Sequence, residues 1–163
     1  MSSIACVFPG QGSQHPEMLQ ADLVDQSFIN EKIEIVSEIL SYDVHNILKD
    51  ESKINATSFT QPLLVLSSAI FSEAYKNLSL SDPKVIAGHS LGEYSALMFA
   101  DSITFEDAIK ITHLRGKLMQ SSEEGKMMAI LGLDSKIIDE VCSKITESNE
   151  KAYVASANYN SMK

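Results

Sequence analysis

The sequence predicts an α/β protein, and two observations carry that prediction. Two short, β-rich apolar runs, 4–8 and 84–87, are each followed by a turn that contains glycine, as buried strands often are. Segments with helical periodicity follow each run, and an alternation of strands with helices is typical of the α/β class. The chain of 163 residues and 17.9 kDa is long enough for a real core, since its mass predicts about 70% of the unfolded surface buried on folding.

Helical periodicity predicts the elements after the first strand. The polar stretch 50–58 predicts a surface loop. Thr60 would cap the helix that follows, with Pro62 in its first turn, where a missing N–H costs nothing. Apolar residues on most faces of 63–75 predict that this helix is central and buried. An earlier amphipathic helix has apolar residues at i, i+4, i+7 and i+11, namely Ile29, Ile33, Val36 and Leu40.

The middle of the chain predicts two further helices. The turn 88–92 leads from the second strand into a helix that ends near Ala100. Thr104 stands three residues before Asp107, as in a capping box with Asp in place of Glu. This pair therefore predicts the start of a helix that reaches about Gln120.

The last part of the chain restarts the pattern. A strand at 127–133, a helix at 135–147 and a strand at 152–157 predict a β-helix-β unit, and hence a second small subdomain. We therefore expect two domains, 1–123 and 124–163. The helix carries an apolar stripe that we expect to be buried, formed by Ile137, Ile138, Val141, Cys142 and Ile145.

Composition and charge argue against several classes of function. Lys and Arg number 13 against 22 Asp and Glu, a formal net charge of −9, whereas nucleic-acid binding asks for a basic face. The two cysteines, Cys6 and Cys142, form no disulfide framework and no metal-ligand cluster, which favours a reducing compartment. The longest apolar stretch, 63–71, is interrupted by serines and is too short to cross a membrane. We expect a cytoplasmic protein that binds no nucleic acid, membrane, metal or cofactor.

Gly88-His89-Ser90-Leu91-Gly92 is a G-x-S-x-G pattern between a predicted strand and a predicted helix. That placement is typical of a nucleophile elbow, in which a sharp turn lifts a serine hydroxyl above the sheet. Ser90 would also stand at a helix N-terminus, where the Leu91 N–H and the positive end of the helix dipole stabilise an oxyanion. The alternative is a tight turn without chemistry.

Arg115 is the only arginine in the chain. We expect it to face the protein body because its neighbours on one helix face are apolar, namely Ala108, Ile111, Leu118 and Met119. An inward guanidinium needs an anion, and its planar fork suits a carboxylate. Together with Ser90, it favours chemistry on an acyl group that carries its own carboxylate. Two alternatives are an internal salt bridge and a side chain that reaches the surface.

The loop Gly10-Gln11-Gly12-Ser13-Gln14 follows the first strand and resembles half of a dinucleotide-binding fingerprint. It lacks the third glycine, because His15 stands there, and the segment after it is helical, which argues against a nucleotide. The alternative use of this glycine-rich loop is to offer the Gln11 backbone N–H as a second oxyanion donor.

Histidines and methionines supply no further site by themselves. A serine without a base is a poor nucleophile. None of the four histidines is a convincing base, that is, His15, His45, His89 and His113. Met119, Met127 and Met128 are typical of core filling, with pocket lining as the alternative.

Four motifs stand in order along the chain: Phe8-Pro9-Gly10-Gln11-Gly12-Ser13-Gln14, Thr60-Gln61-Pro62, Gly88-His89-Ser90-Leu91-Gly92-Glu93-Tyr94, and Arg115-Gly116-Lys117 followed by Met119-Gln120. Together they resemble the malonyl-CoA:acyl-carrier-protein transacylases. The resemblance implies a hydrolase-like parallel-sheet core with helices over 1–123. It further implies that 124–163 is the first half of an incomplete ferredoxin-like small subdomain.

The resemblance also implies roles for the matching residues. Ser90 would be the nucleophile that becomes malonylated, and Arg115 would hold the malonyl carboxylate. The backbone N–H groups of Gln11 and Leu91 would form the oxyanion hole. Pocket positions are matched by Gln61, Met119 and Met127. The implied reaction is ping-pong: Ser90 attacks malonyl-CoA, CoA leaves, and the phosphopantetheine thiol of acyl carrier protein takes the malonyl group, with no cofactor held by the transacylase itself.

Members of that family are about twice as long as this chain, and their catalytic histidine lies in the later half. None of the four histidines here matches it. We therefore expect a truncated chain with a missing C-terminal half. Two alternatives stay open. One is a serine esterase or thioesterase with the same elbow. The other is an inactive fragment or interaction protein, whose uncovered sheet edge and apolar helix faces would drive association.

Overall fold

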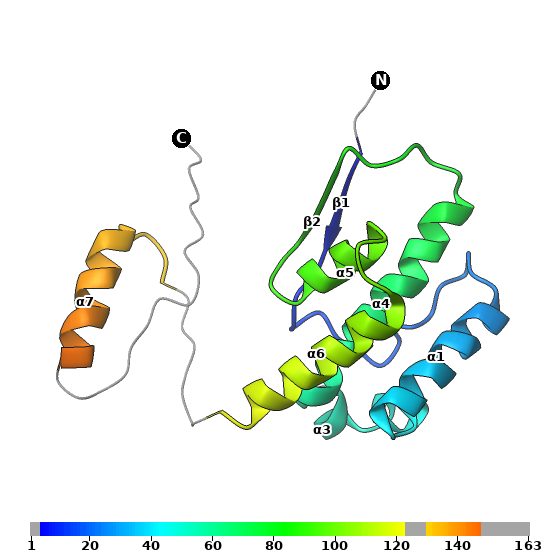
Figure 1. The fold of residues 1–163 in the computed structure, drawn as a ribbon, viewed down its shortest axis with the longest axis horizontal. Helices are drawn as coiled ribbons and strands as arrows, with labels where there is room; N and C mark the ends of the chain where they lie inside the picture. Colours follow the sequence, from blue (N-terminus) through cyan, green and yellow to red (C-terminus); the bar gives the residue numbers. More distant parts are fainter. Residues whose placement is uncertain (1–3, 123–129, 148–163) are drawn as a thin grey trace. The chain divides into compact units, whose positions relative to one another are not determined.

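The computed structural model describes residues 4–122 and 130–147, and the chain divides into two compact units, 1–123 and 124–163. Each unit is described by itself. Figure 1 follows the elements in chain order. The first unit contains β1 (Ala5–Phe8), α1 (Gln26–Leu40), α2 (Val44–Leu48), α3 (Glu51–Ile54), α4 (Thr57–Asn77), β2 (Val85–Gly88), α5 (Gly92–Phe99) and α6 (Phe105–Gln120). The second contains α7 (Ser135–Glu147).

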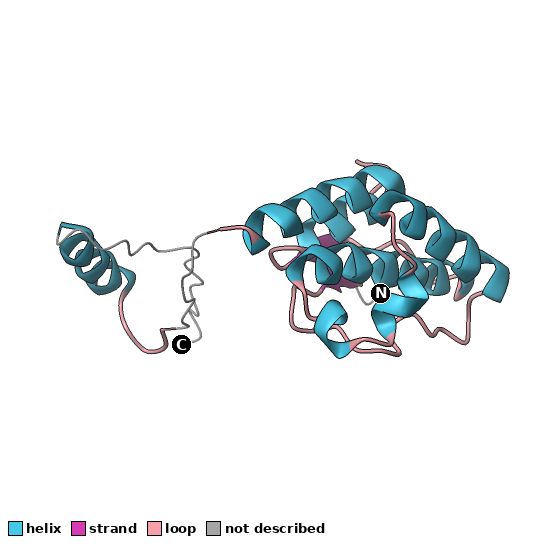
Figure 2. Ribbon diagram, turned by 90° about the horizontal axis from the view of Figure 1, so that it is seen from below, coloured by secondary structure: helices cyan, strands magenta, loops and turns pink. Residues whose placement is uncertain are grey.

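The sheet of the described residues consists of β1 and β2, which run parallel with Ala5 opposite Val85 and Phe8 opposite Gly88. Helix α5 lies against both strands (Figure 1). The centroids of the Phe8 and Phe99 rings lie 5.5 Å apart. Figure 2 shows that helices make up most of the first unit. The predicted α/β class is confirmed. On the other face of the sheet Val7 is 76% exposed, so within the described residues that face is uncovered.

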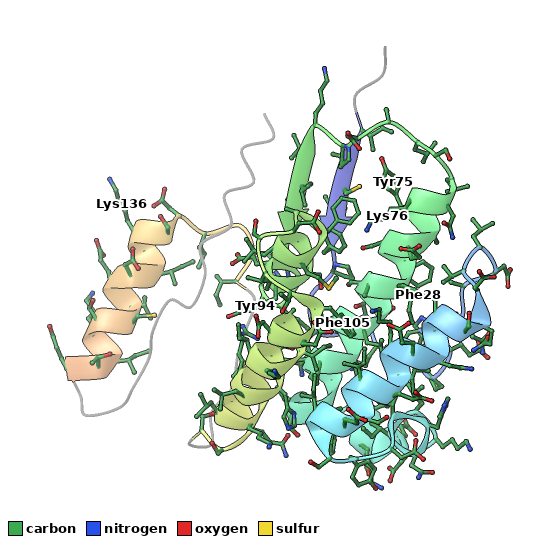
Figure 3. All side chains as sticks on the ribbon, turned by 45° about the vertical axis from the view of Figure 1, so that its right-hand side comes forward. Phe28, Tyr75, Lys76, Tyr94, Phe105 and Lys136 are labelled. Carbon is green, nitrogen blue, oxygen red and sulfur yellow. The ribbon has the colours of Figure 1, made fainter. Side chains whose placement is uncertain are left out.

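The predicted helices around the core are confirmed. In α1 the buried residues are those of the predicted stripe, Ile29, Ile33, Val36 and Leu40. Helix α4 is buried along most of its length, with Leu63, Leu66 and Ile70 fully inaccessible to solvent. Lys32 joins α1 to the start of α6, because its Nζ lies 5.2 Å from the ring centroids of both Phe28 and Phe105. Figure 3 labels Phe28 on α1 and Phe105 at the start of α6.

The surface loop predicted over 50–58 is wrong. Most of that stretch is helical, and Ile54 is buried. The Asp50 carboxylate caps the short helix α3 by accepting hydrogen bonds from the backbone N–H groups of Ser52 and Lys53. Polar residues in this stretch therefore cap a helix or lie on its exposed face instead of forming a loop. Asp and Ser are common both in loops and at helix starts, so their presence does not distinguish the two.

The helix start predicted at Thr60 is also wrong. Helix α4 begins at Thr57, and Thr60 is fully buried inside it, with its hydroxyl donating to the carbonyl oxygens of Ile54 and Ala56 at 2.6 and 3.0 Å. The N-cap residue Ala56 has no side chain for capping. Packing against the rest of the unit therefore overrides the local capping preference and places Pro62 in the interior of the helix instead of its first turn.

Helix α6 has the predicted bounds, and the Thr104 hydroxyl caps it by accepting from the Asp107 N–H at 3.1 Å. The predicted inward face is wrong in part, because Ile111 and Leu118 are 42% and 62% exposed and Met119 is also exposed. The buried residues of α6 are Ala108, Ile109, Thr112 and Gly116. Gly116 lets α6 approach α4 closely, and Arg115 is half-buried next to this face.

In the second unit α7 has the predicted bounds, but the predicted burial of its apolar stripe is wrong. No residue of α7 is buried, since Ile137, Val141 and Ile145 are exposed and Ile138 and Cys142 are half-buried. Within 130–147, α7 is the one regular element, so no second described element of this unit covers its apolar side.

The strands predicted in the second unit have different outcomes. Residues 130–133, the described end of the strand predicted at 127–133, form no strand, and Gly132 there has a φ of +79°, outside the extended region. The first part of that strand and the strand predicted at 152–157 lie outside the described residues. Within the described ranges, no helix combines the length and apolarity that crossing a bilayer requires.

Candidate active site

Ser90 stands at the top of a turn that only glycine neighbours permit. Its φ is +54°, in the left-handed region, which is uncommon for residues with a side chain. A Cβ on Gly88 would lie 2.0 Å from the Gly92 carbonyl carbon, and a Cβ on Gly92 would lie 2.2 Å from the Phe8 carbonyl oxygen. The turn therefore presents an exposed Ser90 hydroxyl just before α5, as a nucleophile elbow does.

Arg115 faces this hydroxyl. Its Nη2 donates a hydrogen bond to Ser90 Oγ at 3.2 Å, and its Nη1 donates to Gln61 Oε1 at 2.8 Å. The guanidinium therefore lies directly beside the Ser90 hydroxyl. Within residues 4–122, no Asp or Glu forms an ion pair with Arg115, in contrast to the alternative of an internal salt bridge. The cation is therefore not neutralised by a described carboxylate of the protein.

Gln61, which accepts from Arg115, is fully buried and makes further hydrogen bonds through its amide nitrogen. Because a guanidinium only donates, the Gln61 amide must turn its oxygen to Arg115 and its nitrogen the other way. Gln61 Nε2 accordingly donates to Gln11 Oε1 at 3.4 Å and to Met119 Sδ at 3.2 Å. Gln11 Nε2 in turn donates to Thr57 Oγ1 at 3.1 Å. Arg115 thus donates on one side to Ser90 and on the other to Gln61, which passes the hydrogen bonds on to Gln11 in the 10–14 loop.

The two backbone groups predicted to form an oxyanion hole are free to donate. Within residues 4–122, the N–H groups of Gln11 and Leu91 make no hydrogen bond to another group of the chain. The 10–14 loop lies against the Ser90 turn, because a Cβ on Gly10 would come within 2.9 Å of His89. The loop is held by its own side chains, since Gln14 accepts from the Gly12 N–H and donates to Asn55.

The first turn of α4 contributes contacts that the sequence does not reveal. A Cβ on Gly116 would lie 2.6 Å from the Thr57 carbonyl oxygen, so α4 and α6 touch at this glycine. Gln120 Oε1 accepts from the Ser58 N–H at 3.1 Å, and His113 Nδ1 lies 2.9 Å from the Ser58 carbonyl oxygen. Gln120 lies 62 residues from Ser58 and His113 lies 55 residues from it, so no local pattern predicts these contacts. The one sequence feature near Ser58 that hints at an unpaired carbonyl is Pro62, four residues later.

One predicted site residue and the four histidines have not yet been placed relative to Ser90. Met127 lies outside the described residues. All four histidines lie within 4–122, and none of them forms a hydrogen bond with Ser90 Oγ. Arg115 does form a hydrogen bond with Ser90 Oγ, but a guanidinium has only N–H donors and no acceptor for the hydroxyl proton. A cation that donates to Oγ stabilises negative charge there, whereas removal of the hydroxyl proton needs a different group.

The groups with a clear pKa shift lie elsewhere in the first unit. A hydrogen bond from the Ser52 side chain lowers the pKa of Asp50, the cap of α3. A hydrogen bond to Tyr42 raises the pKa of Lys53. Desolvation raises the pKa of Tyr75, whose ring packs against Phe99. These shifts belong to helix caps and packing.

The arrangement suits the binding of a small anionic acyl group. A guanidinium is a permanent cation whose fork matches a carboxylate, and here it is held beside a serine hydroxyl and a fully buried amide. Two backbone N–H groups without an acceptor among residues 4–122 belong to the 10–14 loop and to the Ser90 turn. This combination is the one that the sequence predicts for a nucleophile, donors for an oxyanion and a partner for a second negative charge.

Comparisons with known proteins agree with this chemistry. Residues 5–161 match the acyl transferase domain family. The chain is 40% identical over 167 residues to the malonyl CoA-acyl carrier protein transacylase of Haemophilus influenzae, covering 99% of this chain and 53% of that protein. A crystal structure of an acyl carrier protein S-malonyltransferase from Vibrio cholerae is 42% identical with a TM-score of 0.76, covering 88% of this chain and 48% of that one.

A third similar protein was solved with a partner. It is a malonyl-transacylase in complex with a type II polyketide-synthase acyl-carrier protein, 37% identical with a TM-score of 0.76, and the similarity covers 90% of this chain and 49% of that one. The chain thus spans about half the length of the curated relatives and solved structures that it matches.

Proposed function

This chain belongs to the acyl transferase domain family, and from that membership we propose that it carries the nucleophile and the carboxylate-binding side chains of an S-malonyltransferase. The proposed reaction transfers a malonyl group from malonyl-CoA to the phosphopantetheine thiol of acyl carrier protein, in fatty-acid biosynthesis. Relatives that bear this name support the substrate, and the solved complex of a related malonyl-transacylase supports the partner. In this proposal 1–123 belong to the hydrolase-like core and 124–163 begin the small ferredoxin-like subdomain.

One observation carries the proposal: the hydrogen bond from Arg115 Nη2 to Ser90 Oγ at 3.2 Å. A malonyl group esterified to Oγ keeps a free carboxylate two carbons from the ester carbonyl, within reach of a guanidinium so close to that oxygen. An acetyl group leaves the same cation without an anion in a partly desolvated site, which disfavours it. The side chain of Gln61 keeps the guanidinium oriented and contacts Met119 through its Nε2.

The proposed steps balance in atoms and charge. Ser90 Oγ attacks the thioester carbonyl carbon and loses its proton to a base, and the N–H groups of Gln11 and Leu91 stabilise the tetrahedral oxyanion. The C–S bond then breaks, CoA leaves as the thiol, and malonyl-Ser90 remains. In the second half, the thiol of acyl carrier protein gives its proton to the base and attacks the ester carbonyl. The C–Oγ bond then breaks, Ser90 Oγ takes the proton back from the base, and malonyl-acyl carrier protein leaves as the thioester. The base is a group other than the four histidines of this chain, none of which is hydrogen-bonded to Oγ.

Acylation of Ser90 tests the proposal directly. The chain is incubated with malonyl-CoA or acetyl-CoA, and the adduct is followed by intact-mass spectrometry. We expect a malonyl adduct to form slowly, because no histidine of this chain is hydrogen-bonded to Ser90 Oγ, and we expect Ser90→Ala to abolish it. Arg115→Ala is expected to reduce the preference for malonyl over acetyl by roughly 10- to 100-fold, the range for loss of a charged hydrogen bond.

Matched variants decide how that result is interpreted. Arg115→Lys keeps the charge and loses the planar fork, so we expect it to retain only part of the preference. An Arg115→Ala chain with an unchanged preference would contradict the assignment of the carboxylate-binding side chain. Release of free malonate or hydrolysis of simple esters faster than transfer to acyl carrier protein would identify a serine esterase or thioesterase instead.

A further inference from the structure

We propose that His113 is a positioning residue for the Gln61–Arg115 pair, acting through the backbone of Ser58. The inference rests on the proposed function for its activity readout only. His113 does not touch Ser90, and its contact is the hydrogen bond of its Nδ1 to the Ser58 carbonyl oxygen at 2.9 Å. A carbonyl oxygen only accepts, so Nδ1 carries the proton in this contact.

Pro62 creates the need for this donor. In an α-helix the carbonyl of residue 58 accepts from the N–H of residue 62, and proline has no N–H. Ser58 is only 9% exposed, and Pro62 is buried, so water has little access to the carbonyl. A buried carbonyl without a partner is costly, and the His113 ring supplies the partner from the neighbouring helix.

The N–H of the same residue is also bound to α6. Ser58 lies in the first turn of α4, where backbone N–H groups have no helical acceptor, and Ala56 provides no side-chain cap. Gln120 Oε1 accepts from this N–H at 3.1 Å. His113, Gly116 and Gln120 follow one face of α6 at i, i+3 and i+7, and Gly116 lets the two backbones meet there.

This attachment determines where Gln61 stands relative to Arg115. Gln61 follows Ser58 by less than one turn of α4, and Arg115 follows His113 by two residues of α6. The 2.8 Å bond from Arg115 Nη1 to Gln61 Oε1 therefore spans the same helix pair as the His113–Ser58 bond. Without the His113 donor, we expect the first turn of α4 to move away from α6 and the guanidinium to lose its oriented acceptor.

A double-mutant cycle between His113 and Pro62 tests the proposal. Pro62→Ala restores an N–H that can serve the Ser58 carbonyl, so removal of the histidine matters less in that background. We expect His113→Leu to lower the malonyl-over-acetyl preference of Ser90 acylation by about 10-fold with Pro62 present and by less than about 2-fold with Pro62→Ala. The urea midpoint of unfolding is expected to show coupling of the same sign.

The conservative variant distinguishes the hydrogen bond from simple loss of the ring. The amide nitrogen of His113→Asn occupies nearly the position of Nδ1, so this variant should keep the preference within about 2-fold of the original chain. His113→Gln, whose amide nitrogen corresponds to Nε2, should behave like His113→Leu. A chain with His113→Asn that loses as much preference as His113→Leu overturns the proposal.

Two further outcomes separate this inference from the proposed function. Equal losses for His113→Leu with and without Pro62, or no coupling in the unfolding midpoints, overturn the assignment of His113. If Arg115→Ala leaves the malonyl preference unchanged, the proposed function is overturned, whereas the unfolding cycle still decides whether His113 serves the Ser58 carbonyl.

Discussion

The two sides of the candidate site are built in different ways. The Ser90 side is a turn of five consecutive residues whose glycines meet one another and the end of β1 at van der Waals limits. The Gln61–Arg115 side depends on hydrogen bonds between residues more than fifty positions apart, joining α4 to α6. The Ser90 turn is therefore tied to the integrity of the fold, whereas we expect that the Gln61–Arg115 side can be altered while the fold and the turn survive.

The largest effect is expected where the turn itself is broken. In Gly92→Ala, the new Cβ would lie 2.2 Å from the Phe8 carbonyl oxygen, a backbone atom of β1 that cannot move without disturbing the sheet. We expect a loss of roughly 3 kcal/mol or more in unfolding free energy, measured by urea denaturation.

Gly12→Ala is the matched control for that prediction. No atom lies within 4 Å of the Cβ position, and the cost comes only from the φ of +113°. We expect about 1 kcal/mol for this variant. Equal losses for the two glycines would mean that the contact with β1 is not what demands glycine at position 92.

The next effect separates the two sides. Gly116→Ala places a Cβ 2.6 Å from the Thr57 carbonyl oxygen and should push α4 away from α6. The strain exceeds the gain in helix propensity, so we expect a net loss of about 1–2 kcal/mol. Ser90 should still be acylated by acetyl-CoA, while its preference for malonyl-CoA falls. A variant that loses acetylation and malonylation in parallel would show that the sides are not separable.

A smaller effect is expected from the buried amide. Gln61 Oε1 now accepts from Arg115 Nη1 at 2.8 Å. Gln61→Glu puts a carboxylate at this position, which would compete with the carboxylate of a malonyl group for the guanidinium. We expect Ser90 malonylation to slow by about 10-fold or more. Gln61→Met has a similar length and no charge and should slow it less. Equal rates for the two variants would contradict competition for the guanidinium.

The smallest effect is expected far from the site, at the cap of α3. The hydrogen bond from Ser52 lowers the pKa of Asp50 below its ordinary value of 3.8. A carboxyl with a lowered pKa in the folded state contributes stability above its unfolded pKa and loses it as the pH falls through the folded value. The difference in unfolding midpoint between the original chain and Asp50→Asn should therefore shrink as the pH falls below 3.8. A difference that is constant down to pH 3 would contradict this.

Local periodicity predicted most of the helices, and local capping predicted some of their ends. The stripe in α1 and the Thr104 cap of α6 were correct because both depend on residues within a few positions of one another. The predicted start of α4 was wrong because Thr60 has a capping side chain, yet Thr60 is buried inside the helix and the N-cap is Ala56, four residues earlier, where Gln120 contacts the neighbouring Ser58. Capping preferences are weak next to the packing of a whole helix.

By itself, the sequence determined the glycine-bounded turn at Ser90 and the presence of one arginine three turns into α6, because turn geometry and helical spacing follow from neighbouring residues. Tertiary structure alone decided that Arg115 lies at the edge of its helix's buried face with its fork divided between Ser90 and Gln61. It also decided that His113 serves a carbonyl on another helix. The physical reason is that hydrogen bonds and close backbone contacts between distant segments depend on how helices pack, which no local pattern encodes.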